Sequence, residues 1–218
     1  MRALLVALAA ALVLASVAFA DPLDPKKVLV RADEAYAARV ALAQADLGEG
    51  WSGGAIKPPS SLKAPVCPQL RPDFSDLTIT GHAESAWDNG NGGIQVVSDV
   101  EVWRTPKQMA AHYKRMLRPK INACLRYALL KDVGGTNVTI LPVKRTTFPK
   151  LAPVTRHYRA PLWVKSGNQR FTVYSDLIYL GKGRTQVYIN VIAPASAEGQ
   201  LKAFETRIAR AIVARMRG

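Results

Sequence analysis

The sequence predicts a single α+β domain with a mainly antiparallel sheet of about six strands, packed with helices and closed by one disulfide. Short runs of alternating apolar and polar residues, separated by turns rich in Gly and Asn, are typical of antiparallel strands. Elsewhere apolar residues repeat at spacings of three and four, which is typical of helices. The patterns follow the order helix, two strands, two helices, four strands and helix, which indicates a sheet built from hairpins.

The first 20 residues have the composition of a secretory signal peptide. Arg2 precedes an apolar run over residues 3–19, which ends in the A-x-A pattern of residues 18–20. The alternative is an uncleaved anchor, which would need about 20 apolar residues to span a bilayer. We expect cleavage after Ala20, so that residues 21–218 form a single α+β domain that is secreted to the extracellular space or the cell envelope.

The mature chain begins with a predicted helix within residues 24–51, because Leu29, Tyr36 and Val40 belong to one apolar stripe. Gly48 and Gly50 end this helix. A loop rich in Pro, Ser and Gly follows over residues 52–72 and carries the first of the two cysteines.

Cys67 and Cys124 are 57 residues apart. A metal site would require C-x-x-C pairs or histidines at short spacing, a redox site would require a C-x-x-C pair, and the sequence has neither. Thiols oxidise outside the cytoplasm, so we expect one structural disulfide. The chain-entropy estimate of its stabilisation is about 4 kcal/mol.

Two alternating runs, residues 76–87 and 93–103, flank the turn DNGNGG and predict an antiparallel hairpin. Thr105 as N-cap, Pro106 at the first helical position and Gln108 in a T-x-x-Q capping box predict the next helix. A second helix is expected to begin at Pro119, and Cys124 lies on its buried stripe. The disulfide should therefore hold the preceding loop against this helix.

The remaining chain predicts four strands and a final helix. The strands are the alternating runs at residues 136–145, 154–165, 169–180 and 185–194, of which the last three are separated by the turns SGN and GKGR. The helix should begin near Ala197 with Ser196 as its N-cap. Its inward-facing residues are Leu201, Phe204, Ile208, Ile212 and Met216.

Charge divides the mature chain into two halves. Residues 21–103 contain 7 basic and 12 acidic residues, a net charge of −5, whereas residues 104–218 contain 22 basic and 4 acidic residues, a net charge of +18. One interpretation is a surface that binds anionic envelope polymers or lipids. The interpretation we favour is an acidic half packed beside a basic half, because Lys and Arg are scattered. Zinc-finger spacing and RNP-like motifs are absent, so we expect no nucleic-acid partner.

The sequence contains no catalytic motif. It lacks G-x-S-x-G, H-E-x-x-H, G-x-G-x-x-G and the P-loop pattern. Its three histidines lack ligand spacing, and Gly90 and Gly92 leave the DNGNGG turn without the side-chain oxygens of a calcium loop. We therefore predict no enzymatic activity, no metal and no cofactor.

Asp176 lies in the middle of a predicted strand in the basic half of the chain. An ion pair with an arginine on a neighbouring strand is the first interpretation, and a ligand contact is the second. Aromatic residues either line a cavity or fill the core. The candidate ligand-binding residues are Trp103, Trp163, Tyr174, Asp176 and Tyr188.

Several phrases of the sequence together resemble a known family. They are AQADLGEGW, SDLTITGHAES, VVSDVEVWRTPKQM and YLGKGR, combined with one cysteine in a loop and one on a helix. This combination resembles secreted and lipid-anchored actinobacterial envelope proteins of the PknH-like extracellular sensor-domain type. The resemblance implies a sheet covered by helices and a cleft for an unidentified ligand. The second cysteine pair of those sensor domains is absent, and no catalytic residue is carried over.

These observations predict a secreted, non-enzymatic binding or sensor-like domain with a cleft for an unknown small molecule. One alternative is an envelope-association protein that binds an anionic polymer or lipid through its basic C-terminal half. The other is a hydrolase whose site is assembled from residues distant in the sequence.

Overall fold

The computed structural model describes residues 23–56, 67–68, 70–90, 93–133 and 137–218. The predicted signal peptide, residues 1–20, lies outside the described residues.

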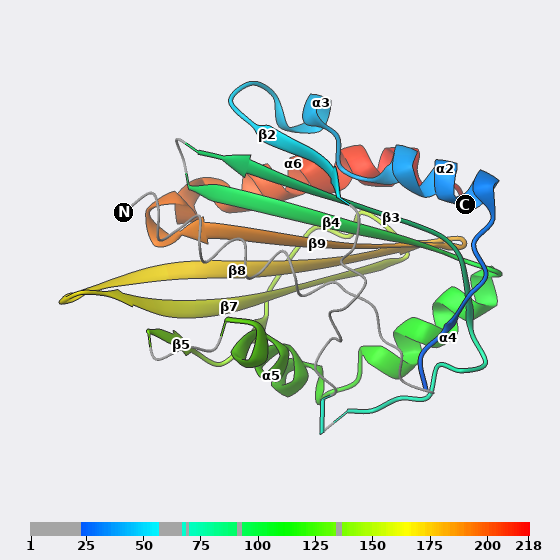
Figure 1. Ribbon diagram of the computed structural model, residues 1–218, viewed down its shortest axis with the longest axis horizontal. Coiled ribbons are helices and arrows are strands. Elements are labelled where there is room, and N and C mark those ends of the chain that lie inside the picture. Colours follow the sequence, from blue (N-terminus) through cyan, green and yellow to red (C-terminus); the bar gives the residue numbers. More distant parts are fainter. Residues whose placement is uncertain (1–22, 57–66, 69, 91–92, 134–136) are drawn as a thin grey trace.

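One mixed sheet of nine strands forms the centre of the molecule (Figure 1). The strands are β1 (Lys26–Lys27), β2 (Ser52–Ile56), β3 (Thr78–Asn89), β4 (Ile94–Trp103), β5 (Val138–Ile140), β6 (Lys144–Arg145), β7 (Val154–Ser166), β8 (Gln169–Lys182) and β9 (Thr185–Pro194). Their order is β1-β3-β4-β9-β8-β7-β5, with β2 paired to β3 and β6 paired to β7. Every pairing is antiparallel except that of β1 with β3.

Helices cover both faces of the sheet. They are α2 (Arg31–Val40), α3 (Gln44–Leu47), α4 (Pro106–Met116), α5 (Ile121–Val133) and α6 (Glu198–Arg215), which follows the 3-10 turn η2 (Ala195–Ala197). In Figure 1, α2 and α6 run beside each other along the upper side, and α4 and α5 lie on the lower side. We call the two faces the α6 face and the α4/α5 face.

Alternation along the strands supplies a separate hydrophobic core to each face. On β8, Ile178 and Leu180 pack toward α2 and α6, whereas Leu177 and Tyr179 pack toward α4 and α5. Side chains of successive strand residues point to opposite faces, so a run that is apolar at every position must be buried on both sides. The structure thus confirms a single α+β domain. It adds the short strands β1 and β2 and divides the predicted strand at residues 136–145 into β5 and β6.

The first predicted helix begins later than expected. Lys26 and Lys27 pair with β3, and the backbone N–H groups of Val28 and Val30 donate to carbonyl oxygens of the same strand at 2.9 and 2.7 Å. Leu29 is 49 % exposed and belongs to no buried stripe. The correction has a physical cause, because the edge of β3 offers this segment backbone partners that a helix would forgo.

The N-terminal cap of α4 agrees with the prediction except for the role of the Gln108 side chain. The hydroxyl of Thr105 accepts a hydrogen bond from the Gln108 N–H at 3.2 Å, and Pro106 begins the helix. The Gln108 side chain instead accepts from the N–H of Thr78 at 3.1 Å, so it joins α4 to the sheet. The predicted cap of the last helix was wrong, because Ser196 lies inside η2 and makes no capping bond.

The predicted disulfide is confirmed. Cys67 and Cys124 are bonded, with their Cα atoms 5.4 Å apart, and the bond joins the loop before β3 to α5.

The acidic and basic halves lie side by side in one sheet, because β4 pairs with β9. Among the described residues, three ion pairs connect an acid of the first half to an arginine of the second, namely Asp33–Arg184, Asp46–Arg215 and Asp76–Arg115. The two halves are therefore packed against each other, as the favoured interpretation of the charge division expected. Binding of anions by the basic half stays a prediction.

Candidate functional site

A cavity of about 290 Å³ lies on the α4/α5 face beside the disulfide. We call it the disulfide pocket. Its walls are largely apolar and come from the loop before β3 and from α4 and α5, and its polar residues include Glu101, His112 and Tyr179 from β4, α4 and β8. The main apolar wall residues are Leu70, Phe74, Met116, Ile121, Leu125 and Ala128.

Two tethers hold the loop over this cavity. One is the disulfide, whose two cysteines themselves line the pocket. The other is Arg115 of α4, which forms an ion pair with Asp76 and donates to the backbone oxygen of Asp73 at 2.7 Å. Both tethers join described residues between Cys67 and Asp76 to α5 and α4, so the covalent bond shapes the pocket as well as stabilising the fold.

A chain of hydrogen bonds crosses the floor of the pocket from α4 to β4. His112 Nδ1 donates to Gln186 Oε1 at 2.7 Å, and Gln186 Nε2 donates to Glu101 Oε2 at 3.1 Å. The imidazole lies between the rings of Phe74 and Trp103, with both centroid separations at 4.6 Å. This packing fixes the ring plane of His112 and the direction of its hydrogen bond.

The surroundings of these two groups favour their uncharged forms. Burial lowers the pKa of His112 to about 4 and Arg115 adds to the effect, whereas the hydrogen bond to Gln186 opposes it. Burial also raises the pKa of Glu101 well above its ordinary value, and the charge of Asp99 acts in the same direction. The pocket floor therefore carries hydrogen-bonding groups with little net charge at neutral pH.

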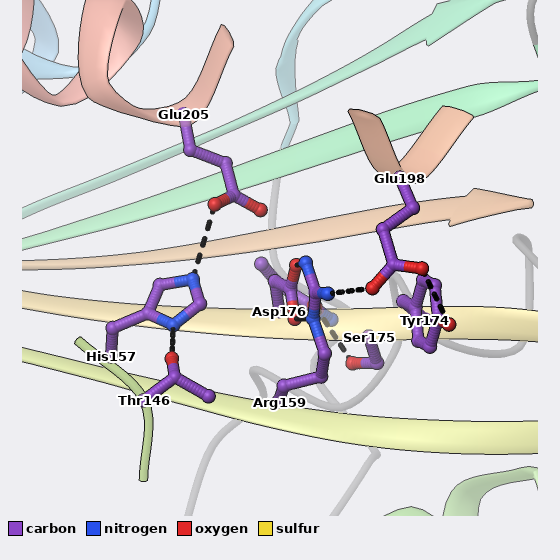
Figure 2. Close-up of polar contacts among 9 residues, drawn as sticks. Thr146, His157, Arg159, Tyr174, Ser175, Asp176, Glu198 and Glu205 are labelled. Atoms are coloured by element: carbon purple, nitrogen blue, oxygen red, sulfur yellow. Dashed lines mark hydrogen bonds and ion pairs between the residues drawn. The ribbon is translucent and has the colours of Figure 1, made fainter. Parts of the chain in front are cut away.

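A second polar cluster lies on the α6 face (Figure 2). Both oxygens of buried Asp176 accept from Arg159, at 2.8 Å from Nε and 2.6 Å from Nη2. Arg159 is the direct partner of Asp176 on the neighbouring strand β7, and its Nη1 also donates to Glu198 at 2.8 Å. The predicted ion pair of Asp176 with an arginine on an adjacent strand is confirmed.

The same cluster contains a buried pair that the sequence did not reveal. His157 Nε2 lies 3.1 Å from Glu205 Oε2, and the other ring nitrogen contacts the hydroxyl of Thr146 (Figure 2). Burial raises the pKa of Glu205, and the neighbouring Asp176 contributes. Glu205 occupies a position in the buried stripe of α6. An acidic residue at a buried position could have predicted a buried basic partner. The three carboxylates of this cluster, those of Asp176, Glu198 and Glu205, each engage a basic side chain, so we interpret the cluster as structural.

The five candidate ligand-binding residues are divided between the two faces. Trp103 and Tyr188 lie on the α4/α5 face, and Trp163, Tyr174 and Asp176 lie on the α6 face. Trp103 is fully buried behind His112, and Tyr188 packs on Tyr179, 5.1 Å away between ring centroids. On the other face the rings of Trp163 and Tyr174 stack against Arg170 and Arg159, at 4.7 and 4.5 Å.

Two of the five candidates therefore adjoin the disulfide pocket without being among its lining residues. Sequence reasoning missed Glu101 and His112, which line the pocket, and Gln186, which joins them by hydrogen bonds; the three come from different elements. No sequence motif of fixed spacing could have predicted them, because they lie far apart in the sequence.

The sequence matches no protein-family profile and no curated protein. Among solved structures, the chain matches an uncharacterised protein of Mycobacterium smegmatis, the ortholog of Rv0999, at a TM-score of 0.40 and 12 % identity. The similarity covers 83 % of this chain and 97 % of the other. Within the described residues, no helix has both the length and the apolar character needed to cross a bilayer.

Proposed function

We propose that this protein is a secreted, non-enzymatic binding or sensor-like domain of the cell envelope, and that its ligand enters the disulfide pocket. The observation that carries the proposal is a largely apolar pocket, bordered by the disulfide, over a floor of polar groups with little charge. Ligand sites in proteins commonly combine apolar walls with a few convergent polar groups of perturbed pKa. The resemblance to PknH-like sensor domains implies a cleft of this kind.

The dimensions of the pocket define the class of ligand. A cavity of about 150 Å³ accommodates one benzene ring, so the disulfide pocket, at about 290 Å³, has room for roughly two rings or a short acyl chain. Asp24 and Arg71 also line the pocket and carry opposite charges, whereas His112 and Glu101 on its floor are neutral. The floor therefore favours a ligand with one uncharged polar group, because a buried ion would meet no opposite charge there. We therefore propose a small, largely apolar ligand with a single hydroxyl, carbonyl or amide.

The hydrolase alternative receives less support from the pocket. His112 and Glu101 do converge there, but the described lining residues include no serine, no threonine and no free thiol. The Nδ1 proton of His112 is already engaged by an amide oxygen. Hydrolysis by covalent catalysis would need a nucleophile next to a base, so a binding function fits these residues better.

The anionic-surface alternative has one specific observation in its favour. Lys202, Arg207 and Arg210 are exposed on the outer side of α6, and the described residues lining the shallow hollow beside them include no acid. Binding through this face should weaken steeply as salt rises, because exposed charges are screened. Co-sedimentation with vesicles containing phosphatidylglycerol, at increasing sodium chloride, tests this candidate. Binding that is independent of salt would argue against it.

The pocket can be tested by filling it. Ala128→Phe places a ring in the pocket, whereas Ala123→Phe adds the same ring on the exposed side of the same helix. Native mass spectrometry of the exported protein should show a retained small-molecule adduct on the wild type and on Ala123→Phe. Ala128→Phe should lose it. An adduct that survives in Ala128→Phe, or an adduct-free wild type that also binds no member of a library of two-ring compounds, would contradict the proposal.

A further inference from the structure

We propose that His82, Glu84 and Asp99 form a binding site for a divalent transition-metal ion. The three residues lie on the neighbouring strands β3 and β4 and point to the α4/α5 face. Each offers one ligand atom, and these atoms all lie within 4.8 Å of one another. The inference is independent of the ligand proposed for the disulfide pocket.

The distances already match those of a metal centre. Nε2 of His82 lies 3.1 Å from Asp99 Oδ1 and 3.3 Å from Glu84 Oε1. Zinc bonds to nitrogen and oxygen of about 2.0 to 2.1 Å place neighbouring ligands of a tetrahedron about 3.3 Å apart. An ion could therefore be bound at this point with little movement of His82 toward either carboxylate.

The arrangement differs from that of an ordinary ion pair. Two carboxylates converge on one ring nitrogen, although a single N–H can donate well to only one of them. Glu84 and Asp99 are also direct cross-strand partners, where like charges destabilise a sheet. Glu101, whose surroundings favour its uncharged form, stands opposite His82 and adds no further charge, so the repulsion is that between Glu84 and Asp99. A divalent cation would relieve this repulsion.

A second trio, His157, Asp176 and Glu205, is grouped as closely but has a different character. Arg159 donates to both oxygens of Asp176, so that carboxylate is already paired with the positive charge of a guanidinium group. The His157 and Glu205 side chains are 5 % and 1 % exposed, whereas those of His82 and Asp99 are 14 % and 15 % exposed and only Glu84 of that trio is fully buried. The trio on β3 and β4 is thus the one that an ion can reach from solvent.

The donor set indicates the class of metal. One imidazole and two carboxylates suit Zn²⁺ and related first-row ions, whereas Ca²⁺ and Mg²⁺ prefer sites built from oxygen alone. The site also lies next to the disulfide pocket, because Glu101 lines that cavity and is the cross-strand neighbour of His82. The structure therefore places the proposed ion beside a space that could hold a further ligand.

Calorimetric titration of the chelator-treated protein with Zn²⁺ alone tests the proposal. The wild type should bind one ion, and His82→Ala and Asp99→Asn should each bind at least about tenfold more weakly. Glu49→Gln removes one exposed carboxylate elsewhere and should bind as the wild type does. Equal Zn²⁺ affinity in all four proteins, or no binding by the wild type, would overturn the inference.

A measurement on the unaltered chain guards against a variant that fails to fold. The protein has only three histidines, so the ring signals in a nuclear magnetic resonance spectrum are few. Zn²⁺ should shift the ring signals of His82 and leave those of His157 unchanged. Shifts at His157, with none at His82, would move the site to the α6 face and refute the proposal.

Discussion

Lowering the pH from 7 to 4 should destabilise the protein through His112. In the unfolded chain this imidazole takes up a proton near pH 6.5, whereas in the folded state burial lowers its pKa to about 4. Between these values the unfolded state binds the extra proton, so stability falls as the pH falls. At about 1.36 kcal/mol per pH unit, the contribution of this residue is a loss of roughly 3 kcal/mol.

The effect can be isolated by comparison with His112→Asn. Asparagine places an N–H near the position of Nδ1, so it can donate to Gln186, but it does not titrate. The variant loses the stacking between Phe74 and Trp103, which lowers its stability by an amount that does not depend on pH. Buried Glu205, whose pKa is raised, contributes in the opposite direction in both proteins and cancels in the difference.

Urea denaturation at intervals from pH 7.5 to 4 provides the measurement. The difference in unfolding free energy between the wild type and His112→Asn should narrow by roughly 3 kcal/mol across the window from 6.5 to 4. If the unfolding free energies of the wild type and His112→Asn change in parallel with pH, His112 is solvated or paired with a charge in the folded state. The proposed uncharged pocket floor would then be wrong as well.

Three further perturbations test the fold. Replacing both cysteines with serine should cost about 4 kcal/mol of unfolding free energy; urea midpoints that equal those of the oxidised wild type would show that the tether is redundant. Asp176→Asn leaves the half-buried Arg159 with its Glu198 partner alone and should cost about 3 kcal/mol, at the lower end for a broken buried pair; an unchanged thermal midpoint would contradict this. Gly81→Ala should cost about 2 kcal/mol or more, since its Cβ would lie 2.4 Å from backbone atoms, whereas Gly199→Ala on α6 meets no atom within 4 Å and should be neutral or stabilising; equal midpoints for the two variants would refute the packing argument.

The strands could be predicted because each carries its own pattern. β8 alternates between two buried faces, and β9 follows a glycine turn, so local chemistry and tertiary structure agree there. The helix predicted over residues 24–30 was wrong because three apolar residues in a row are compatible with a helical stripe and with an extended segment at a sheet edge. Only the presence of β3 decides between them, and that partner is some 50 residues away.

The disulfide and the Asp176 ion pair were predictable from residue types alone, since each requires only one partner of a known kind. The pocket was not predictable. Its floor joins Glu101, Gln186 and His112 from β4, β9 and α4, and these residues meet only because β4 pairs with β9. The same holds for Glu205, whose partner His157 lies on a strand nearly 50 residues earlier.

The pairing of β4 with β9 has a consequence for how the chain folds. The other long strands pair with their neighbours in the sequence, so they can form as hairpins in microseconds. Closing the seam between β4 and β9 must bring together residues such as Val102 and Thr185, 83 positions apart. Relative to a four-residue hairpin loop, that closure costs about 3 kcal/mol more in chain entropy. β4 belongs to the acidic half of the chain and β9 to the basic half. Attraction between the two halves therefore favours the strand pairing that spans the longest stretch of sequence in the described sheet.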